Sequence, residues 1–131
     1  MRITVDTNVL LRAAINDDPA SGSKARDLLQ HAELVVVSLA SLCEFVWVAS
    51  RTYKLPRAAI ASAIGDLLSG NQVVCDRAAA EAGLAMLVAG GDFADGIIAF
   101  EGRRLGGDIF ATFDKKAARL IAETGGRVEL L

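Results

Sequence analysis

The sequence predicts a single α/β domain over residues 1–131, built around a mainly parallel sheet with helices on both faces. Three observations support this fold class. Short apolar runs that suit buried strands alternate with segments of helical spacing along the chain. Glycine pairs follow several of the helical segments, as C-terminal caps often do. The chain contains no repeat, low-complexity tract or linker that would divide it.

Five short segments are the predicted strands, and the second of them is a continuous apolar run that suits a buried parallel sheet. They lie at residues 3–5, 34–37, 72–74, 108–111 and 127–130. The first belongs to a longer segment, "RITVDTNVLL", which is strand-like throughout.

Helices are predicted where apolar residues recur three, four and seven positions apart. This spacing occurs at residues 25–32, 39–46 and 60–68, and Pro56 stands where the third of these helices can start. Further helices are predicted at 76–89, 94–105 and 115–123, each followed by a glycine pair.

The composition is that of a soluble globular protein, with 53% apolar and 23% charged residues. No apolar stretch is long enough to span a membrane, and no signal peptide is evident, so we expect a cytoplasmic protein. Cys43 and Cys75 lie among apolar residues and are interpreted as core thiols in a reducing compartment. His31 is interpreted as a solvated surface residue. The net charge of −2 disfavours a polyanionic substrate unless bound cations offset the acids.

Two carboxylates stand alone in otherwise apolar segments. Asp6 is the only ionised group between Arg2 and Arg12, and Glu44 is the only charged residue from 34 to 50. An ionised carboxylate in apolar surroundings is costly unless cations or hydrogen-bond donors receive it. For Glu44 a structural alternative exists, since Ser41 and Glu44 match a capping box; Ser38 is nevertheless the better helix start, because it directly follows a strand.

Three further acids open predicted helices. Asp92 and Asp95 follow a glycine pair in "GGDFADGIIAF", and Asp114 follows the apolar strand in "IFATFDKK". Acids in a first turn are favoured by the helix dipole, and Asp114 is a suitable N-cap, so each has a purely structural explanation.

Considered together, Asp6, Glu44, Asp95 and Asp114 lie where strands lead into helices or in the first two turns of those helices. In an open parallel sheet such positions gather at the carboxyl edge of the strands, where ligands bind. Crowded carboxylates repel one another, and a divalent cation removes this conflict. An all-carboxylate set suits Mg²⁺ or Mn²⁺ better than zinc. The four acids therefore predict a metal pocket.

Four blocks of the sequence carry a family resemblance over nearly the whole chain. They are "VDTNVLLR", "SLASLCEFVWV", "GGDFADGIIAFEGRRLGG" and "IFATFDKKAAR". In their order, spacing and flanking residues the chain resembles the PIN-domain ribonucleases, specifically the VapC-type toxins of toxin–antitoxin modules. The resemblance implies a PIN-like three-layer α/β/α domain and a metal-dependent endoribonuclease with Asp6, Glu44, Asp95 and Asp114 as its acidic set.

The resemblance also implies supporting residues and partners. Asn8 and Thr112 would support the first and last acids, each two residues from its partner in a strand-like segment, and Asp92 is an additional acid. Metal-activated water would attack the phosphodiester, leaving a 5′-phosphate and a 3′-hydroxyl. A cognate antitoxin would cover the pocket, with Phe45, Trp47 or Phe93 as anchors unless these rings are core residues. A homodimer is also implied.

Two basic groups are candidate RNA contacts. The first contains Arg51, Lys54 and Arg57, with Tyr53 between them as a stacking ring; the second contains Arg103, Arg104, Lys115, Lys116 and Arg119. The alternative interpretation is ordinary solvated charge on helix surfaces. Contact with RNA phosphates would make binding strongly salt-dependent.

Two other functions are compatible with the acids. One is a non-catalytic module that binds a metal or a basic partner. The other is a different Mg²⁺-dependent phosphate hydrolase with an aspartyl nucleophile, although Asn8 stands where a dehalogenase-like phosphatase would need an acid.

Overall fold

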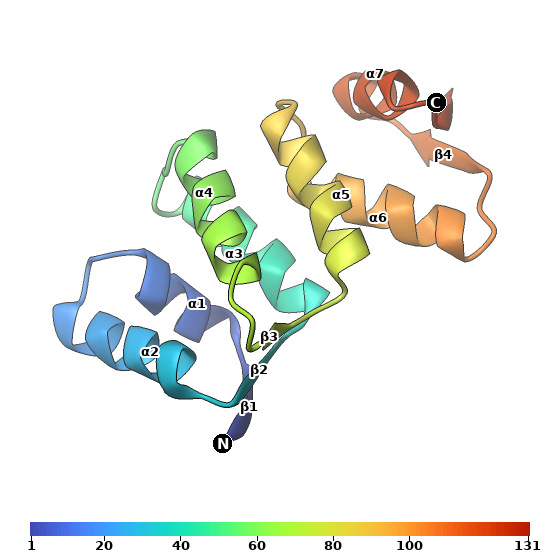
Figure 1. Ribbon diagram of the computed structural model, residues 1–131. Helices are drawn as coiled ribbons and strands as arrows, with labels where there is room; N and C mark the ends of the chain where they lie inside the picture. The colour runs from blue at the N-terminus through green and yellow to red at the C-terminus, as the bar shows by residue number, and fades with distance from the viewer. The chain divides into compact units, whose positions relative to one another are not determined.

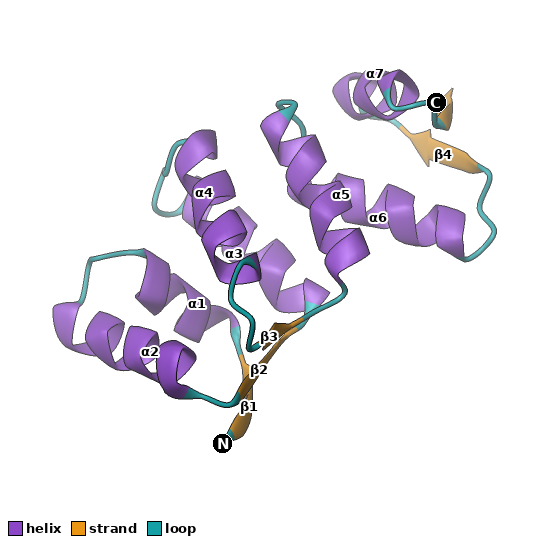
Figure 2. Ribbon diagram, viewed as in Figure 1, coloured by secondary structure: helices purple, strands orange, loops and turns teal.

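Strands and helices alternate from one end of the chain to the other (Figures 1 and 2). The computed structural model describes residues 1–131. The strands are β1 (Arg2–Val5), β2 (Leu34–Val37), β3 (Val73–Val74), β4 (Ile109–Thr112) and β5 (Arg127–Leu130). The helices are α1 (Thr7–Ala14), α2 (Pro19–His31), α3 (Leu39–Arg51), α4 (Arg57–Leu68), α5 (Arg77–Val88), α6 (Phe93–Arg104) and α7 (Lys115–Glu123).

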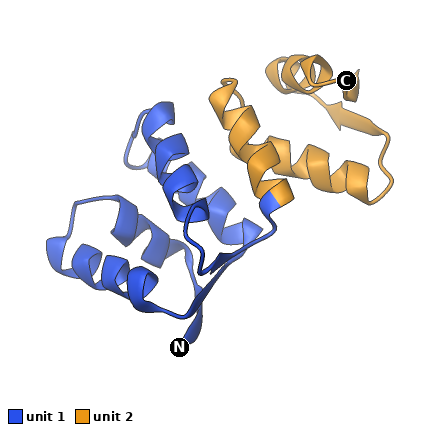
Figure 3. Cartoon of the chain, in the orientation of Figure 1, with its two compact units in different colours: residues 1–77 blue, residues 78–131 orange.

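The chain divides into two compact units, residues 1–77 and residues 78–131 (Figure 3). Each unit contains its own parallel sheet, with the order β1-β2-β3 in the first unit and β4-β5 in the second. The prediction of parallel strands alternating with helices is therefore confirmed. The single domain over residues 1–131 stays a prediction.

Buried valines at the centre of the first unit explain why β2 is its middle strand. Val35 pairs with Ile3 of β1 on one side and with Val73 of β3 on the other. Val35 and Val37 are almost completely buried, as is Leu42 of α3. A strand that is paired on both sides requires this kind of continuous apolar sequence.

The strand-like interpretation of residues 2–11 is wrong beyond Val5, because α1 begins at Thr7. Asp6 takes an extended backbone conformation and caps the new helix. Leu10 and Leu11 become core residues on one side of α1. A short apolar run does not distinguish a strand from a buried helix, which is why the sequence pattern misled here.

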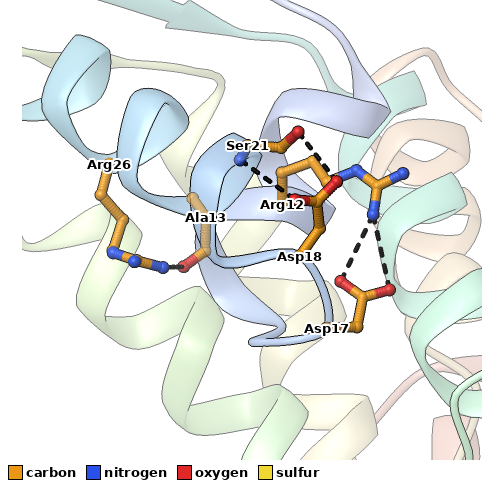
Figure 4. A network of polar contacts seen from close by, with 6 residues as sticks. All are labelled: Arg12, Ala13, Asp17, Asp18, Ser21 and Arg26. Atoms are coloured by element: carbon orange, nitrogen blue, oxygen red, sulfur yellow. Dashed lines mark hydrogen bonds and ion pairs between the residues drawn. The ribbon is translucent and has the colours of Figure 1, made fainter.

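Polar contacts join α1 to α2 around the turn between them (Figure 4). Arg12 forms an ion pair with Asp17 at 3.3 Å. Asp18 caps α2 by accepting hydrogen bonds from the backbone amide and the hydroxyl of Ser21, and these bonds hold the pKa of Asp18 below its usual range. Arg26 donates to the Ala13 carbonyl at 3.4 Å. The turn is thus held at both helix ends.

Arg77 stabilises the segment that connects α4 to β3. Its guanidinium donates hydrogen bonds to the carbonyl oxygens of Leu68, Gly70 and Val73. Leu68 is the last residue of α4, so one of these bonds satisfies a helix carbonyl that has no partner within the helix.

The second unit is built around a cluster of Met86, Leu120 and Ile121, against which Phe110 of β4 and Val128 of β5 pack. Because α7 supplies two of these side chains, it covers one face of the β4-β5 sheet. Helix α7 has the bounds that the sequence predicts, residues 115–123.

Glycine pairs end the helices of this unit, as predicted. At the end of α5, Gly91 donates to the Met86 carbonyl and Gly90 to the Leu87 carbonyl, which is a Schellman motif. Gly90 has φ of +99°, a left-handed conformation that favours glycine. Backbone bonds in the same pattern end α6 at residues 106–107 and α7 at residues 125–126.

Three smaller predictions have mixed outcomes. His31 is exposed at the end of α2, as expected. Cys43 and Cys75 form no disulfide, and each is only half-buried, so neither is a true core residue. None of the helices combines the length and apolar character that crossing a membrane requires.

Candidate active site

Asp6 stands between β1 and α1 in the first unit. Its Oδ1 accepts a hydrogen bond from the Val9 amide at 3.1 Å, which caps the first turn of α1. The other oxygen, Oδ2, has no protein partner, and the residue is exposed. One side chain therefore fixes the helix start and still presents a free carboxylate oxygen to solvent.

Glu44 lies in the second turn of α3 and is linked to α1 of the same unit. The hydroxyl of Thr7 donates a hydrogen bond to Glu44 Oε2 at 2.7 Å. Thr7 directly follows Asp6, so this bond brings Glu44 to the helix end that Asp6 caps. Thr7 is not recognisable as a site residue in the sequence, because nothing in its local sequence signals a contact 37 residues away.

The capping-box alternative for Glu44 does not occur. Helix α3 begins after Ser38, whose hydroxyl accepts a hydrogen bond from the Ser41 amide at 3.1 Å. The Ser41 hydroxyl donates to the Ser38 carbonyl at 3.0 Å. Glu44 therefore has no structural role at the helix start, and its carboxylate remains available for chemistry.

In the second unit, Asp92 and Asp95 lie at the start of α6, directly after the glycine turn that ends α5. Asp92 caps the helix by accepting a bond from the Asp95 amide at 3.2 Å. Gly96 allows α6 to approach α5 closely, because a Cβ at this position would lie 2.6 Å from the Ala82 carbonyl oxygen. This close crossing fixes where Asp95 stands.

The carboxyl of Asp95 is electrostatically unusual. Partial burial, together with the negative charges of Asp92 and Asp114, holds the pKa of Asp95 above its usual range. No cation offsets these effects. Such crowding favours either a proton or a bound metal ion.

Asp114 stands between β4 and α7, as Asp6 stands between β1 and α1. Its Oδ1 accepts hydrogen bonds from the amides of Lys116 at 2.9 Å and Ala117 at 3.0 Å. Its own amide donates to the Thr112 hydroxyl at 3.0 Å, so Thr112 contacts the acid that it was predicted to support. Oδ2 of Asp114 has no protein partner.

Asn8 does not stand in the strand-like geometry that was predicted for it. It lies in α1, where residues two positions apart point to different sides. Its side chain lines a groove between α1 and α2 together with Arg12 and Lys24. Asn8 lies in a helix and not in a strand because α1 already begins at Thr7.

The two basic groups lie near helix ends. Arg51 ends α3, and Lys54 follows it with a left-handed backbone, φ +55°. Arg103 and Arg104 end α6. Arg104 is paired with Glu101 at 3.5 Å, as Arg119 of α7 is with Glu123, so both fit the solvated-charge alternative. Lys115 is exposed beside Asp114 and has no ion pair.

The three aromatic side chains suggested as docking anchors differ in exposure. Phe45 and Phe93 are core residues, with 4% and 1% of their surface exposed. They are therefore poor anchors for a partner protein. Trp47 is 58% exposed on α3.

The donors in both units fit a hard divalent cation. All are carboxylate oxygens, and no cysteine or histidine stands among them. The structure groups no three acidic, cysteine or histidine side chains closely enough to hold an ion. Within the first unit, the Thr7–Glu44 hydrogen bond links Glu44 to the helix end that Asp6 caps. Within the second unit, Asp92 and Asp114 act electrostatically on Asp95.

Comparison with known families gives one match, which extends over both units. The sequence profile of the PIN domain matches residues 3–122, which is most of the chain and includes Asp6, Glu44, Asp92, Asp95 and Asp114. The chain belongs to the PIN domain family. PIN domains are generally nucleases that use divalent metal ions, and their fold is the α/β class that the sequence predicts. A search of curated proteins found no match for this PIN-domain chain.

Proposed function

We propose that this PIN-domain protein is a Mg²⁺-dependent endoribonuclease that acts in the cytoplasm as the toxin of a toxin–antitoxin pair. The observation that carries the metal requirement is the crowding at Asp95. Partial burial and two further carboxylates raise the pKa of Asp95, and no cation of the chain offsets them. A divalent ion is the partner that such a group lacks.

We assign Asp6, Glu44, Asp95 and Asp114 to one metal-binding set. Support comes from the unshared Oδ2 atoms of Asp6 and Asp114, from the hydrogen bond that fixes Glu44, and from the position of all four acids within the PIN match. Mn²⁺ has similar ligand preferences and would replace Mg²⁺. Asp92 and Thr112 hold the backbone around Asp95 and Asp114.

The proposed reaction is hydrolysis of an RNA phosphodiester. The bound ion would lower the pKa of a water ligand and offset phosphate charge. Water oxygen forms the new bond to phosphorus while the bond to the ribose 3′-oxygen breaks, and the departing oxygen receives a proton. The products carry a 5′-phosphate and a 3′-hydroxyl. Lys115, which is exposed beside Asp114, is suited to contact the negatively charged substrate.

Cleavage of total cellular RNA by the purified protein tests this proposal. The reaction is run with Mg²⁺, with Mn²⁺ and with EDTA. Metal-dependent fragments with 5′-phosphate ends are expected, and Asp95→Asn should abolish them. Asp66→Asn on α4 is the matched control, since it makes the same chemical change at an exposed acid outside the set.

The outcomes separate the alternatives. If Asp95→Asn cleaves as well as the unmodified protein, the assignment of the metal set is wrong. Metal binding by calorimetry without cleavage of any RNA would favour a non-catalytic binding module. Hydrolysis of small phosphate esters in place of RNA would indicate the other class of hydrolase.

The toxin role, the antitoxin and a homodimer rest on the resemblance to VapC-type proteins. Expression of the unmodified protein in a test bacterium should arrest growth, whereas Asp95→Asn should not. Co-expression of the cognate antitoxin should restore growth and yield a complex on size-exclusion chromatography with light scattering. Growth arrest by both forms would contradict a toxin that acts through cleavage.

A further inference from the structure

An exposed tryptophan stands one turn beyond Glu44 on α3. Trp47 has 58% of its surface exposed, although a ring of this size is highly buried on average. Glu44 and Trp47 are three residues apart, so their side chains emerge from neighbouring positions on the helix surface. The exposed ring therefore adjoins a residue that we assign to the metal-binding set.

A cation covers part of this ring. The Arg51 guanidinium carbon lies 6.0 Å from the centroid of the Trp47 ring, which is the limit of a cation–π contact. Arg51 follows Trp47 by four residues, and no carboxylate is paired with it. Lys54 is also exposed, and its ammonium group approaches the Arg51 carbonyl at 3.4 Å. This end of α3 is thus positively charged, and no carboxylate is paired with Arg51 or Lys54.

We propose that Trp47 and Arg51 form a subsite for one nucleotide of single-stranded RNA, in which the base stacks on the Trp47 ring and the phosphate contacts Arg51. The proposal rests on the nuclease function proposed above and identifies part of its substrate-binding surface. Unpaired bases stack on aromatic rings and on guanidinium planes, which makes both side chains suitable partners.

The order of residues along α3 determines where this nucleotide lies. Glu44, Trp47 and Arg51 are at positions i, i+3 and i+7 of one helix face, and the helix rises about 1.5 Å per residue. The stacked base would therefore lie about one turn from the metal-binding carboxylate. The positively charged end of α3 would guide the phosphate chain away from the acids.

Charge favours RNA over a second copy of the chain as the occupant of this face. A symmetric contact between two copies would bring like charges of Arg51 and Lys54 together. A phosphate and a base together satisfy both members of the Trp47–Arg51 pair. The comparable pair on α6, Phe100 with Arg104 at 5.9 Å, differs because Arg104 is already paired with Glu101.

Trp47 is the only tryptophan in the chain, so its fluorescence reports on the subsite directly. The experiment titrates the unmodified protein with a short single-stranded RNA in EDTA, where no cleavage occurs. Saturable quenching of the Trp47 fluorescence is expected. An oligonucleotide of equal length that has sugars and phosphates but no bases should quench it only slightly. If Trp47 fluorescence is quenched as the protein concentration rises but does not change when RNA is added, Trp47 contacts a second copy of the chain. That result would overturn the proposal.

Variants separate stacking from general attraction. In a labelled-RNA binding assay, Trp47→Leu should weaken the affinity for RNA by roughly five- to tenfold. Trp47→Phe keeps an aromatic ring and should weaken this affinity less. Arg51→Gln should weaken binding and reduce its dependence on salt. Phe100→Leu is the matched control and should change affinity less than twofold. Equal affinity of Trp47→Leu and the unmodified protein would refute the subsite.

These measurements are independent of catalysis, so the two proposals can fail separately. Quenching of Trp47 by RNA in a protein that never cleaves RNA would retain the subsite and reject the nuclease. Metal-dependent cleavage without any quenching would retain the nuclease and reject the subsite.

Discussion

Thr7 Oγ1 donates a 2.7 Å hydrogen bond to the carboxylate of Glu44 and thereby joins the start of α1 to the second turn of α3. The two residues belong to different helices of the same unit. In both helices they lie close to the carboxyl ends of strands β1 and β2, which pair in parallel. The bond limits the positions that the Glu44 carboxylate can adopt.

Thr7→Val should lower RNA cleavage by roughly tenfold, because an unrestrained Glu44 would be a poorer metal-binding group. Thr7→Ser keeps the hydroxyl and should restore most of the activity. The measurement is cleavage rate against Mg²⁺ concentration, where loss of positioning raises the Mg²⁺ requirement. An unchanged Mg²⁺ requirement in Thr7→Val would show that the bond is only structural.

Metal binding should depend on pH through Asp95. Because the pKa of Asp95 lies above its usual range, protons should compete with Mg²⁺ at a higher pH than at an ordinary aspartate. Asp92→Asn removes one of the repelling charges and should move the midpoint of metal binding to lower pH. Asparagine also caps helices well, so α6 should persist.

Calorimetric titration of Mg²⁺ at a series of pH values measures that midpoint. Asp66→Asn is the control and should not change the pH midpoint of Mg²⁺ binding. A midpoint that is the same with and without Asp92 would contradict the charge coupling.

Asp95→Asn should stabilise the metal-free protein at neutral pH. The pKa of Asp95 is higher in the folded than in the unfolded state, so its contribution to stability is full below the unfolded pKa and is lost as pH rises through the folded pKa. Asparagine removes this penalty, and since the site is partly exposed we expect a rise in Tm of roughly 1–3 °C.

Thermal unfolding in EDTA at pH 7 and pH 3 tests the sign of this effect. At the lower pH Asp95 is protonated in the unmodified protein, so the difference in Tm should shrink. A difference that grows at pH 3 would be inconsistent with a raised pKa.

Gly96→Ala should destabilise the second unit by about 1–3 kcal/mol, because the new methyl group would collide with the backbone of α5. Gly102→Ala is the matched control on the same helix, where a Cβ meets no atom within 4 Å. This control should be neutral or stabilising by up to about 1 kcal/mol. Urea denaturation of both variants measures the difference, and equal stabilities would argue against a close crossing of α5 and α6.

Much of the fold could be predicted because local signals agree with the structure. Helix α7 lies between a cap at Asp114 and a glycine turn at 125–126, and both signals are local. Strand β2 is a run of aliphatic residues after an exposed helix end. Helix α1 was missed because Val9, Leu10 and Leu11 form an apolar run that is too short to show a helical period.

The acids could be proposed from the sequence, but their contacts could not. The structural explanations predicted for Asp95, in the first turn of α6, and for Asp114, as an N-cap, are correct. Asp6 and Asp92 are also N-caps, and capping does not compete with a chemical role for the second carboxylate oxygen. Thr7 could not be found, because its partner Glu44 is distant in sequence. The raised pKa of Asp95 likewise depends on partial burial and, beside Asp92, on Asp114, which caps another helix.

The double role that we propose for the capping aspartates, as caps and as metal ligands, affects how the proposed nuclease could lose its activity. Asparagine replaces aspartate as a cap at little cost, yet it is a neutral and much weaker ligand for a hard cation. One base change in an aspartate codon would therefore suffice to produce a chain that folds normally but lacks the proposed nuclease activity. Such silenced copies would keep every surface that recognises RNA or a partner protein, and a cell that harbours one would carry a decoy in place of a nuclease.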